Sequence, residues 1–580
     1  MAKDTDQRKF NAYVKSKTKY HESIGPLVIN NKLVSEDKEM ASQLNQYFGS
    51  VFSDENTNTI PSPAKLNYRS KFEDMHFTKD MVEKKIKSLK PSHAAGPDGM
   101  SSIFLQSFQS SLSLPLALIY NSSLQSGTVP RDWRDAEVTP IHKKGPKGKS
   151  ENYRPVSVTS VPGRVKESLL KDGIVQHLEE NKLINGSQHG FMKGKSCLTN
   201  LLEFFDNVTK NIDCENAMDI VYLDFSRAFD KAPLKRLLSK FEAHGISGKV
   251  LKWIENWLSD RRQKVVINGQ SSDWVKVRSG VPQGSVLGPV AFTIFINDLD
   301  HCANDLSIIN KFADDTKLGH VVKNEMDKNV LQNTLNKLCK WAEDWGMCFN
   351  EKKCTVLHVG KNNNKFDYFM NGVQLSESKQ EKDLGIIVSN DLKYSSQCKE
   401  AVRRANFNLY QISKAFHYRD KTTFLNLYKS HVRCHLEYAV PAWSPYLQGD
   451  IDLLENVQKR AINMISGLDG KNYEERLKEL KLPSLQERRI RYDMIQVYKT
   501  LHGANSSKIL QTVNTKSAHQ TRSVACPLNL KKQRCSTAIR QNFFSQRAVD
   551  EWNKLPATLK EAQTVGSFKR LFDTHVKMNN

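Results

Sequence analysis

Long apolar runs and paired cysteines are both missing from this chain of 580 residues. A membrane-spanning helix needs about twenty consecutive apolar residues, and the sequence contains no such run. The ten cysteines occur singly, with no Cys-x-x-Cys, which argues against a disulfide framework or a zinc ribbon. The charged start, residues 1–9, has no apolar segment behind it, so we expect no secretory signal and no membrane partner. We therefore expect a reduced, non-secreted protein of the nucleus and cytoplasm.

Acidic residues are also in deficit. The chain has 63 Asp and Glu against 86 Lys and Arg, a net charge of +23. Residues 471–580 hold 21 Lys and Arg against 9 Asp and Glu, and no acidic residue occurs from Met494 to Val549. A solvated protein face rarely lacks acids over such a length, so a polyanionic partner is favoured, nucleic acid before membrane.

Two places in the sequence hold carboxylates in unusual settings. Ala217–Leu223 is a nearly continuous apolar run, typical of a strand buried on both faces, and it ends at Asp224. Asp314 and Asp315 sit between an apolar run and a Thr-Lys-Leu segment, the pattern of a β-hairpin with an acidic tip. Carboxylates held together or at the end of a buried strand suggest a divalent cation. The alternative for the Asp-Asp pair is an ordinary solvated turn.

A basic hairpin and a small-residue loop provide the second set of candidates. Residues 137–144 predict a strand ending in Lys143 and Lys144, and the returning strand at 152–158 carries Arg154. Such a hairpin can fold over a triphosphate, although a solvated basic turn is the alternative. Residues 279–289 combine glycines with Gln283 and lead into a predicted helix, an arrangement that can host a base and phosphates.

A third loop, residues 188–197, has two glycines and two lysines without the spacing of a Walker loop. We interpret it as a contact to a nucleic-acid strand. Phe229, five residues after Asp224, fits either a core position or the wall beneath a nucleotide sugar.

These features follow one another in the order of a polymerase palm, and the chain resembles the reverse transcriptases of non-LTR (LINE-type, jockey-like) retrotransposons. The resemblance covers about residues 23 to 470 and rests on six ordered motifs. They are Gly96-Pro-Asp-Gly99, Tyr153-Arg-Pro-Val156, Gly190-Phe-x-x-Gly-x-Ser-Cys197, Leu223-Asp-Phe-Ser-x-Ala-Phe-Asp230, Gly280-Val-Pro-Gln-Gly-Ser-Val-Leu-Gly-Pro289 and Phe312-Ala-Asp-Asp315.

The resemblance implies a role for each candidate. Asp224, Asp314 and Asp315 would hold two Mg²⁺ ions for phosphoryl transfer, with Asp314 the stronger candidate of the pair. The residues implied for the nucleotide are Lys143 or Lys144, Arg154, Phe229, Gln283 and Gly284, and Lys353 would protonate the departing pyrophosphate. The bulk of Phe229 would exclude a ribose 2′-hydroxyl. Asp383 occupies a place in the family's primer-grip segment where an aromatic residue is more usual.

The implied fold is an α/β (α+β) right-hand polymerase, with fingers and palm built on an antiparallel sheet backed by helices. We divide the chain into an N-terminal extension and linker (1–90), fingers and palm (91–392), a helical thumb (393–470) and a basic nucleic-acid-binding region (471–580). The implied activity is RNA-directed DNA synthesis from an RNA template, a DNA primer and deoxynucleoside triphosphates, with target DNA as a further partner.

Family members carry an endonuclease ahead of the polymerase, and this sequence starts in what resembles the linker between them. We therefore expect polymerisation without nicking. A different class of function, a catalytically decayed retroelement protein that only binds nucleic acid, is the alternative.

Overall fold

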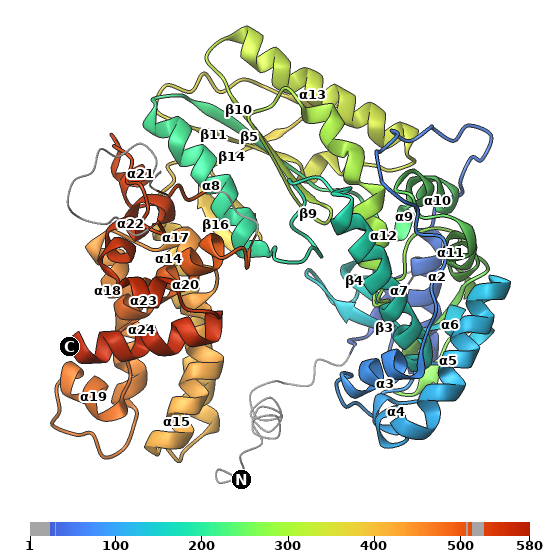
Figure 1. Cartoon of the computed structure of the whole chain (residues 1–580), viewed down its shortest axis with the longest axis horizontal. Coiled ribbons are helices and arrows are strands. Elements are labelled where there is room, and N and C mark those ends of the chain that lie inside the picture. Colours follow the sequence, from blue (N-terminus) through green and yellow to red (C-terminus); the bar gives the residue numbers. More distant parts are fainter. Residues whose placement is uncertain (1–23, 30, 506–508, 513–526, 580) are drawn as a thin grey trace.

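The computed structural model describes residues 24–29, 31–505, 509–512 and 527–579. The chain forms an arch in which a central β-sheet joins an N-terminal part on one side to a bundle of C-terminal helices on the other (Figure 1). In the described part of the chain, no helix has the length and apolarity that crossing a bilayer requires. The predicted mixed α/β class is confirmed.

The central sheet has five strands in the order β14 (Ser376–Ser378), β11 (Thr355–Val359), β5 (Met218–Leu223), β10 (Asp315–Val321) and β9 (Ile308–Phe312). The middle strand β5 pairs antiparallel with β10 and with β11, whereas β11 and β14 run parallel. The sheet is therefore not purely antiparallel, which the sequence-based prediction did not anticipate.

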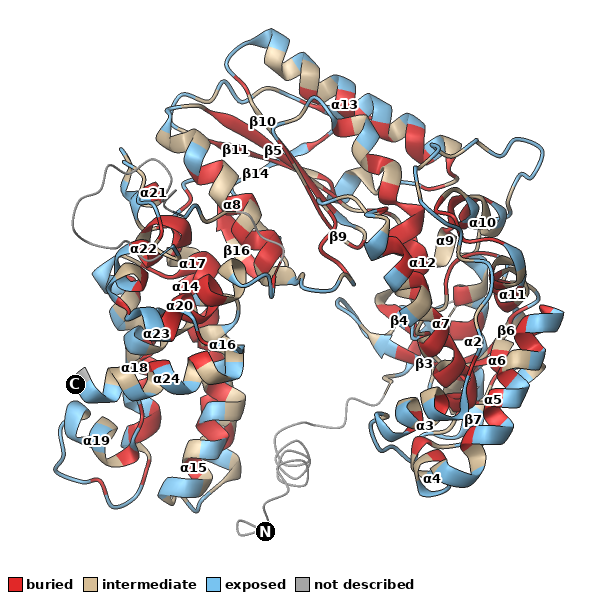
Figure 2. Cartoon of the chain, viewed as in Figure 1, coloured by how far each residue is buried: buried red, intermediate tan, exposed pale blue. Residues whose placement is uncertain are grey.

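Alternate residues of β5 enter two different hydrophobic cores. Val221 and Leu223 pack with α13 (Glu325–Asp344), while Met218 and Ile220 pack on the other face with α8 (Cys197–Asp213). Figure 2 shows the resulting strand as buried along its length. This confirms the strand predicted from the continuous apolar run, because a strand covered on both sides needs no polar face.

The N-terminal sheet consists of β4 (Tyr153–Val158), β3 (Ala136–His142), β6 (Arg262–Ile267) and β7 (Gln270–Ser271), with β8 (Val275–Lys276) also paired to β6. The hairpin of β3 and β4 is the predicted basic hairpin, while β3 and β6 are parallel. The helix α2 (Asp37–Ser50) places Met40, Leu44 and Phe48 against this sheet. Residues 37–50 thus belong to the core of the N-terminal sheet and are not a detached extension.

Further helices surround the two sheets. They are α3 (Lys79–Lys87), α4 (Ser102–Ser107), α5 (Gln109–Ser126), α6 (Arg131–Arg134), α7 (Val161–Glu180), α9 (Ala228–Lys231), α10 (Leu234–Ala243), α11 (Gly248–Leu258) and α12 (Gly288–Phe295). Thr78 caps the start of α3, because its hydroxyl accepts a hydrogen bond from the Met81 backbone N–H.

The lysine Lys166 of α7 is fully buried within this part of the molecule. Its ammonium has no hydrogen-bond partner among the described residues and lies 4.5 Å from the ring centre of Trp253, with Phe77 and Trp133 slightly farther away. Burial lowers the pKa of Lys166 to about 6. The aromatic faces attract the cation, but this attraction does not offset the loss of water.

Replacing this buried amine should stabilise the fold. Between pH of about 6 and the ordinary lysine pKa of 10.5, the unfolded chain carries a proton on Lys166 that the folded chain lacks, so the wild-type free energy of unfolding rises with pH. We expect Lys166→Met to increase the free energy of unfolding at pH 7, by an amount that shrinks by up to about 1.4 kcal/mol for each pH unit gained. Denaturant titrations at several pH values measure this, with Lys171→Met on the same helix as control. A difference that does not change with pH would contradict the prediction.

The C-terminal half contains small β-elements followed by helices. The strands are β12 (Phe369–Met370) and β13 (Val373–Gln374), then the hairpin β15 (Gln380–Asp383) and β16 (Ile386–Ser389), while β1 (Leu27–Ile29) and β2 (Lys32–Val34) form a separate ribbon near the N-terminus. The helices are α14 (Ser395–Ala415), α15 (Lys421–Leu427), α16 (Arg433–Glu437), α17 (Val440–Trp443), α18 (Gln448–Asn463), α19 (Tyr473–Leu480), α20 (Leu485–Leu501), α21 (Ala538–Gln541), α22 (Phe544–Lys554), α23 (Ala557–Lys560) and α24 (Val565–Asn579).

One hydrophobic core runs through these helices and reaches the central sheet. It joins Phe205 of α8, Leu409 of α14, Val457 of α18 and Trp552 of α22. The division predicted at residue 470 therefore falls inside a shared core.

Several C-terminal cations also serve this packing. The Arg540 guanidinium lies 2.7 Å from Asp206 of α8, and the Arg547 guanidinium lies 2.9 Å from Asp493 of α20. Part of the basic charge in residues 471–580 is thus neutralised inside the protein, and residues 506–508 and 513–526 of the acid-free stretch lie outside the described residues.

Candidate active site

Three strand ends of the central sheet meet at one edge. Pairing of Leu223 with Thr316 and of Tyr222 with Thr355 places the next residue, Asp224, opposite Asp315 on one side and Lys353 on the other. The Lys353 ammonium lies 3.0 Å from the Asp224 carboxylate. The sheet register therefore brings Asp224 and Asp315 together and adds a cation that the sequence order alone did not place.

The acidic turn between β9 and β10 has an unusual backbone. Ala313 has φ of 55°, the left-handed region that residues with a Cβ rarely adopt. Asp314 follows it, and Asp315 is the first residue of β10. The predicted acidic tip of a hairpin is confirmed.

Both carboxylates of the turn hold their protons more tightly than usual. Burial, together with the charge of Asp224, raises the pKa of Asp314, and the cations of Arg154 and Lys143 oppose that rise. Desolvation by the surrounding protein and then the charges of Asp314 and Asp224 raise the pKa of Asp315 to about 6, although its side chain can still be reached by water. A divalent cation would relieve this repulsion.

The three carboxylates are not arranged as a finished metal site. Among the described residues, no group of three or more His, Cys, Asp or Glu side chains is positioned to hold a metal ion. Asp224 is instead paired with Lys353. Joint metal binding would therefore require Asp224 to leave this ion pair.

The basic hairpin reaches this edge through one of its two paired lysines. Partial burial and the charges of Arg154 and Lys353 lower the pKa of Lys143, while Asp224 opposes the effect. The charge of Lys143 also acts on Asp314 and Asp315, and both Lys143 and Lys144 are exposed. Of the two lysines left open by the sequence, Lys143 is the one whose charge acts on the carboxylates.

The small-residue loop packs closely on the chain around Phe229. A Cβ on Gly280 would lie 2.5 Å from the Phe229 carbonyl oxygen, and one on Gly284 would lie 2.3 Å from the Ser157 carbonyl oxygen. Both contacts are too short for any side chain, so glycine is required at both positions. The Phe229 ring stacks on Phe292, with 4.4 Å between ring centres, and is only partly buried.

Gln283 is held by a half-buried carboxylate, Asp230, to which the sequence alone gave no role. The Gln283 amide donates a 2.7 Å hydrogen bond to Asp230, and burial raises the pKa of Asp230. Phe229, Asp230 and Gln283 line a small cavity of about 30 Å³ together with Phe48, Arg227 and Ser157. Asp230 is the last residue of the motif Leu223–Asp230 that also contains Asp224. Its place in that motif is the sequence signal that could have identified it as a site residue.

The structure explains why an aspartate, Asp383, stands where the family's primer-grip segment more usually has an aromatic residue. Asp383 forms a buried ion pair with Lys317 of β10, and the Lys317 ammonium lies 4.2 Å from the ring centre of Phe204. Burial lowers the pKa of Lys317, while Asp383 opposes the effect. The pair joins the hairpin of β15 and β16 to the strand that carries Asp315.

Breaking the ion pair between Lys317 and Asp383 should lower the free energy of unfolding. Asp383→Leu leaves the Lys317 ammonium buried without a counterion, which should cost about 3–5 kcal/mol in the free energy of unfolding. Lys317→Met combined with Asp383→Leu removes both charges and should recover most of that loss. Asp550→Leu, which breaks an exposed pair with Lys532, should change stability by less than about 1 kcal/mol. Urea titrations compare the variants, and equal effects of Asp383→Leu and Asp550→Leu would contradict the expectation.

The loop at residues 188–197 does not face outward throughout. Gln188 and His189 are buried and contact β9 and α8, so these two residues are unsuited to the nucleic-acid contact that we interpreted from the sequence. Phe191 and Lys193 remain exposed.

Comparison with known proteins gives a consistent result. Residues 141–388 match the family described as reverse transcriptase (RNA-dependent DNA polymerase). The chain is 27% identical over 403 residues to the probable RNA-directed DNA polymerase from transposon BS of Drosophila melanogaster, covering 66% of this chain and 44% of that protein. It is 25% identical over 364 residues to the RNA-directed DNA polymerase from mobile element jockey of the same fly, covering 61% and 40%.

A beetle protein matches as well. The chain is 24% identical over 293 residues to the retrovirus-related Pol polyprotein from type-1 retrotransposable element R2 of Popillia japonica, covering 48% of this chain and 39% of that protein. The matches span less than half the length of these relatives. Residues 141–388 are therefore similar to reverse transcriptases, and the chain is similar to the RNA-directed DNA polymerases of these mobile elements.

Proposed function

We propose that this chain is an RNA-directed DNA polymerase that extends a DNA 3′-hydroxyl on an RNA template. The observation that carries the proposal is the sheet register, which places Asp224 beside the Asp314–Asp315 turn. The relatives named RNA-directed DNA polymerase support the same activity.

The carboxylates fit divalent metal ions by their chemistry. Oxygen ligands suit Mg²⁺, and a bound divalent cation would offset the burial and mutual repulsion that raise the pKa of Asp314 and of Asp315. We propose that Asp224, Asp314 and Asp315 hold two ions. Bound there, the ions would lower the pKa of the primer hydroxyl and neutralise the triphosphate.

The other site residues of this chain bind and orient the nucleotide. Lys143 and Arg154 attract the triphosphate, Arg154 through its planar guanidinium. Phe229, fixed by its stacking on Phe292, forms the wall beneath the sugar. Gln283, held by Asp230, and the exposed backbone of Gly284 line the pocket. Lys353, once released from Asp224, is a donor for the pyrophosphate.

We assign the N-terminal sheet to the fingers, the central sheet to the palm and α14 to α18 to the thumb. Residues 471–580 would bind RNA or DNA through those cations that are not paired inside the fold. The RNA template, the DNA primer and target DNA are the proposed nucleic-acid partners, in a ribonucleoprotein of the nucleus and cytoplasm.

Primer extension tests the proposal. The purified chain, an RNA template with an annealed DNA primer, the four deoxynucleoside triphosphates and Mg²⁺ should give full-length DNA. No product from a chain that still binds the template would leave the decayed nucleic-acid-binding protein as the better description.

A further inference from the structure

The acidic turn is held from behind by the loop at residues 185–190. The backbone N–H of Lys311 donates to the Ser187 carbonyl at 2.9 Å, and the N–H of His189 donates to the Lys311 carbonyl at 2.8 Å. Gln188 and Lys311 thereby form a parallel β-bridge. The loop thus extends the sheet beside β9, directly before the turn.

The side chain of Gln188 reaches the turn itself. Its oxygen accepts the backbone N–H of Ala313 at 2.9 Å and that of Gly190 at 2.7 Å, and the side chain is buried. Ala313 is the residue with the unfavourable positive φ. Because this backbone conformation is disfavoured for alanine, a fixed acceptor for its N–H stabilises a geometry that the turn would otherwise leave.

The glycine after His189 makes this contact possible. A Cβ on Gly190 would lie only 2.4 Å from the Ala313 backbone nitrogen. Any larger residue there would push the loop and the turn apart. Gly190 is therefore required by close packing on the turn.

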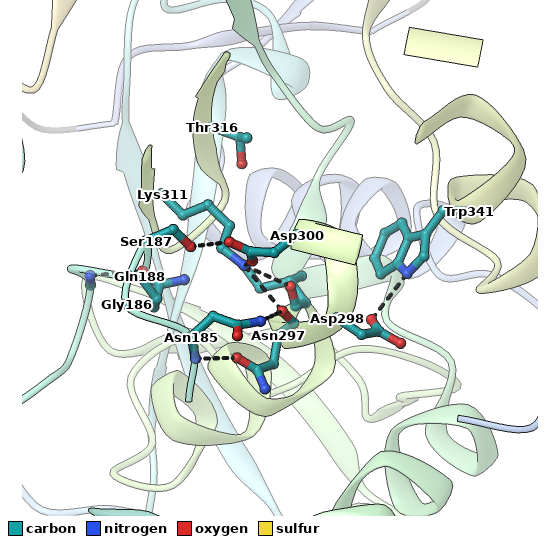
Figure 3. A network of polar contacts seen from close by, with 12 residues as sticks. Asn185, Gly186, Ser187, Gln188, Asn297, Asp298, Asp300, Lys311, Thr316 and Trp341 are labelled. Carbon is teal, nitrogen blue, oxygen red and sulfur yellow. Dashed lines mark hydrogen bonds and ion pairs between the residues drawn. The ribbon is translucent and has the colours of Figure 1, made fainter. Parts of the chain in front are cut away.

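A network of buried charges anchors the loop and β9 to the rest of the fold (Figure 3). The fully buried Lys311 ammonium pairs with Asp300, which also accepts a hydrogen bond from the Ser187 hydroxyl. The same ammonium donates to the backbone carbonyls of Ile296 and Asn297, and the Asn185 amide donates to the Asn297 carbonyl at 2.7 Å. The loop at residues 185–190 and strand β9, which together support the acidic turn, are thereby both bonded to residues 296–300.

We propose that Gln188 is a positioning residue of the polymerase, holding Ala313 in its left-handed conformation so that Asp314 and Asp315 face Asp224. The proposal rests on the proposed polymerase function. Gln188 acts through the backbone of the turn, and it touches neither nucleotide nor metal. A misplacement of about 1 Å at reacting groups can lower a rate about 100-fold, so loss of this contact should be visible in kcat.

The decisive experiment combines Gln188→Met with Ala313→Gly in the full chain. Methionine keeps the length of glutamine but cannot accept the two N–H groups, so kcat for primer extension should fall about 100-fold, with KM for the deoxynucleotide changed less than about threefold. Glycine adopts positive φ without penalty, so Ala313→Gly in the Gln188→Met background should restore kcat by about tenfold or more. A merely structural glutamine would show no such rescue.

Gln458→Met is the matched control. Gln458 is fully buried among α18, Tyr428 and Tyr473, far from the turn in sequence, and its loss should lower the melting temperature while leaving kcat within about twofold. If Gln188→Met lowers kcat only as much as Gln458→Met at equal loss of stability, or if Ala313→Gly gives no rescue, the proposal is wrong.

Two further measurements keep the test decisive. Should Gln188→Met not fold, Gly190→Ala probes the same contact from the other side, and a normal kcat in that variant would overturn the proposal. Hydrogen exchange of the segment 308–316 should be faster in either variant than in wild type, and unchanged exchange would count against it. Because exchange needs no polymerase activity, an inactive wild type would refute the proposed function without deciding this inference.

Discussion

Asp314→Asn should abolish DNA synthesis, lowering the rate of single-nucleotide incorporation by about 1,000-fold or more, the scale on which loss of an electrostatic group at a reacting centre is felt. Asparagine matches the shape of aspartate but lacks its charge, so the turn should keep its conformation. The raised pKa of Asp314 reflects burial beside Asp224, and a bound cation is the natural counter-charge for both. The measurement is single-turnover extension of a labelled primer on RNA at saturating Mg²⁺.

A surface carboxylate near the same sheet provides the control. Asp305 is exposed and contacts Lys337 at 3.5 Å, so Asp305→Asn should leave extension unchanged. Template binding measured by fluorescence anisotropy should be the same in both variants, because the charge removed from Asp314 lies at the reacting groups. Extension by Asp314→Asn within tenfold of wild type would exclude this residue from the metal site.

Phe229→Val should relax the choice of sugar. The Phe229 ring stacks on Phe292 and cannot swing aside easily, so a ribose 2′-hydroxyl would meet a fixed wall. Removing that wall should improve kcat/KM for a ribonucleotide relative to its deoxynucleotide by about 10- to 200-fold, the range available to one small steric difference in a pocket. Competing incorporation of dCTP and CTP opposite a template guanine measures the ratio.

Phe229→Tyr separates bulk from hydrophobicity. Tyrosine retains the ring and its stacking surface, so the preference for deoxynucleotides should persist in this variant. If Phe229→Val discriminates against CTP as strongly as wild type does, the sugar is selected by another group.

Much of the site follows from local sequence pattern. The apolar run before Asp224 predicted a strand buried on both faces, and the sequence around Asp314 predicted a hairpin tip; both are present. Gly280 and Gly284 lie where backbones touch. Such features are readable because side-chain periodicity and the absence of a Cβ act on the residues themselves.

The partners of buried charged and polar side chains could not be predicted from local sequence pattern. Nothing near Asp383 in sequence points to Lys317, and nothing near Gln188 points to Ala313. A buried ion pair or hydrogen bond satisfies a group with whatever side chain the fold brings to it, often more than a hundred residues away.

The sequence by itself determined the order of the motifs, the strand that delivers Asp224 and the acidic hairpin that faces it. Only the tertiary structure decided that Lys353 pairs with Asp224, that the charge of Lys143 acts on the carboxylates, and that α2 and the described residues after 470 share cores with their neighbours. The physical reason is that strand formation is governed by local pattern, whereas the choice among nearby cations and the sharing of a core depend on sheet register and packing between distant segments.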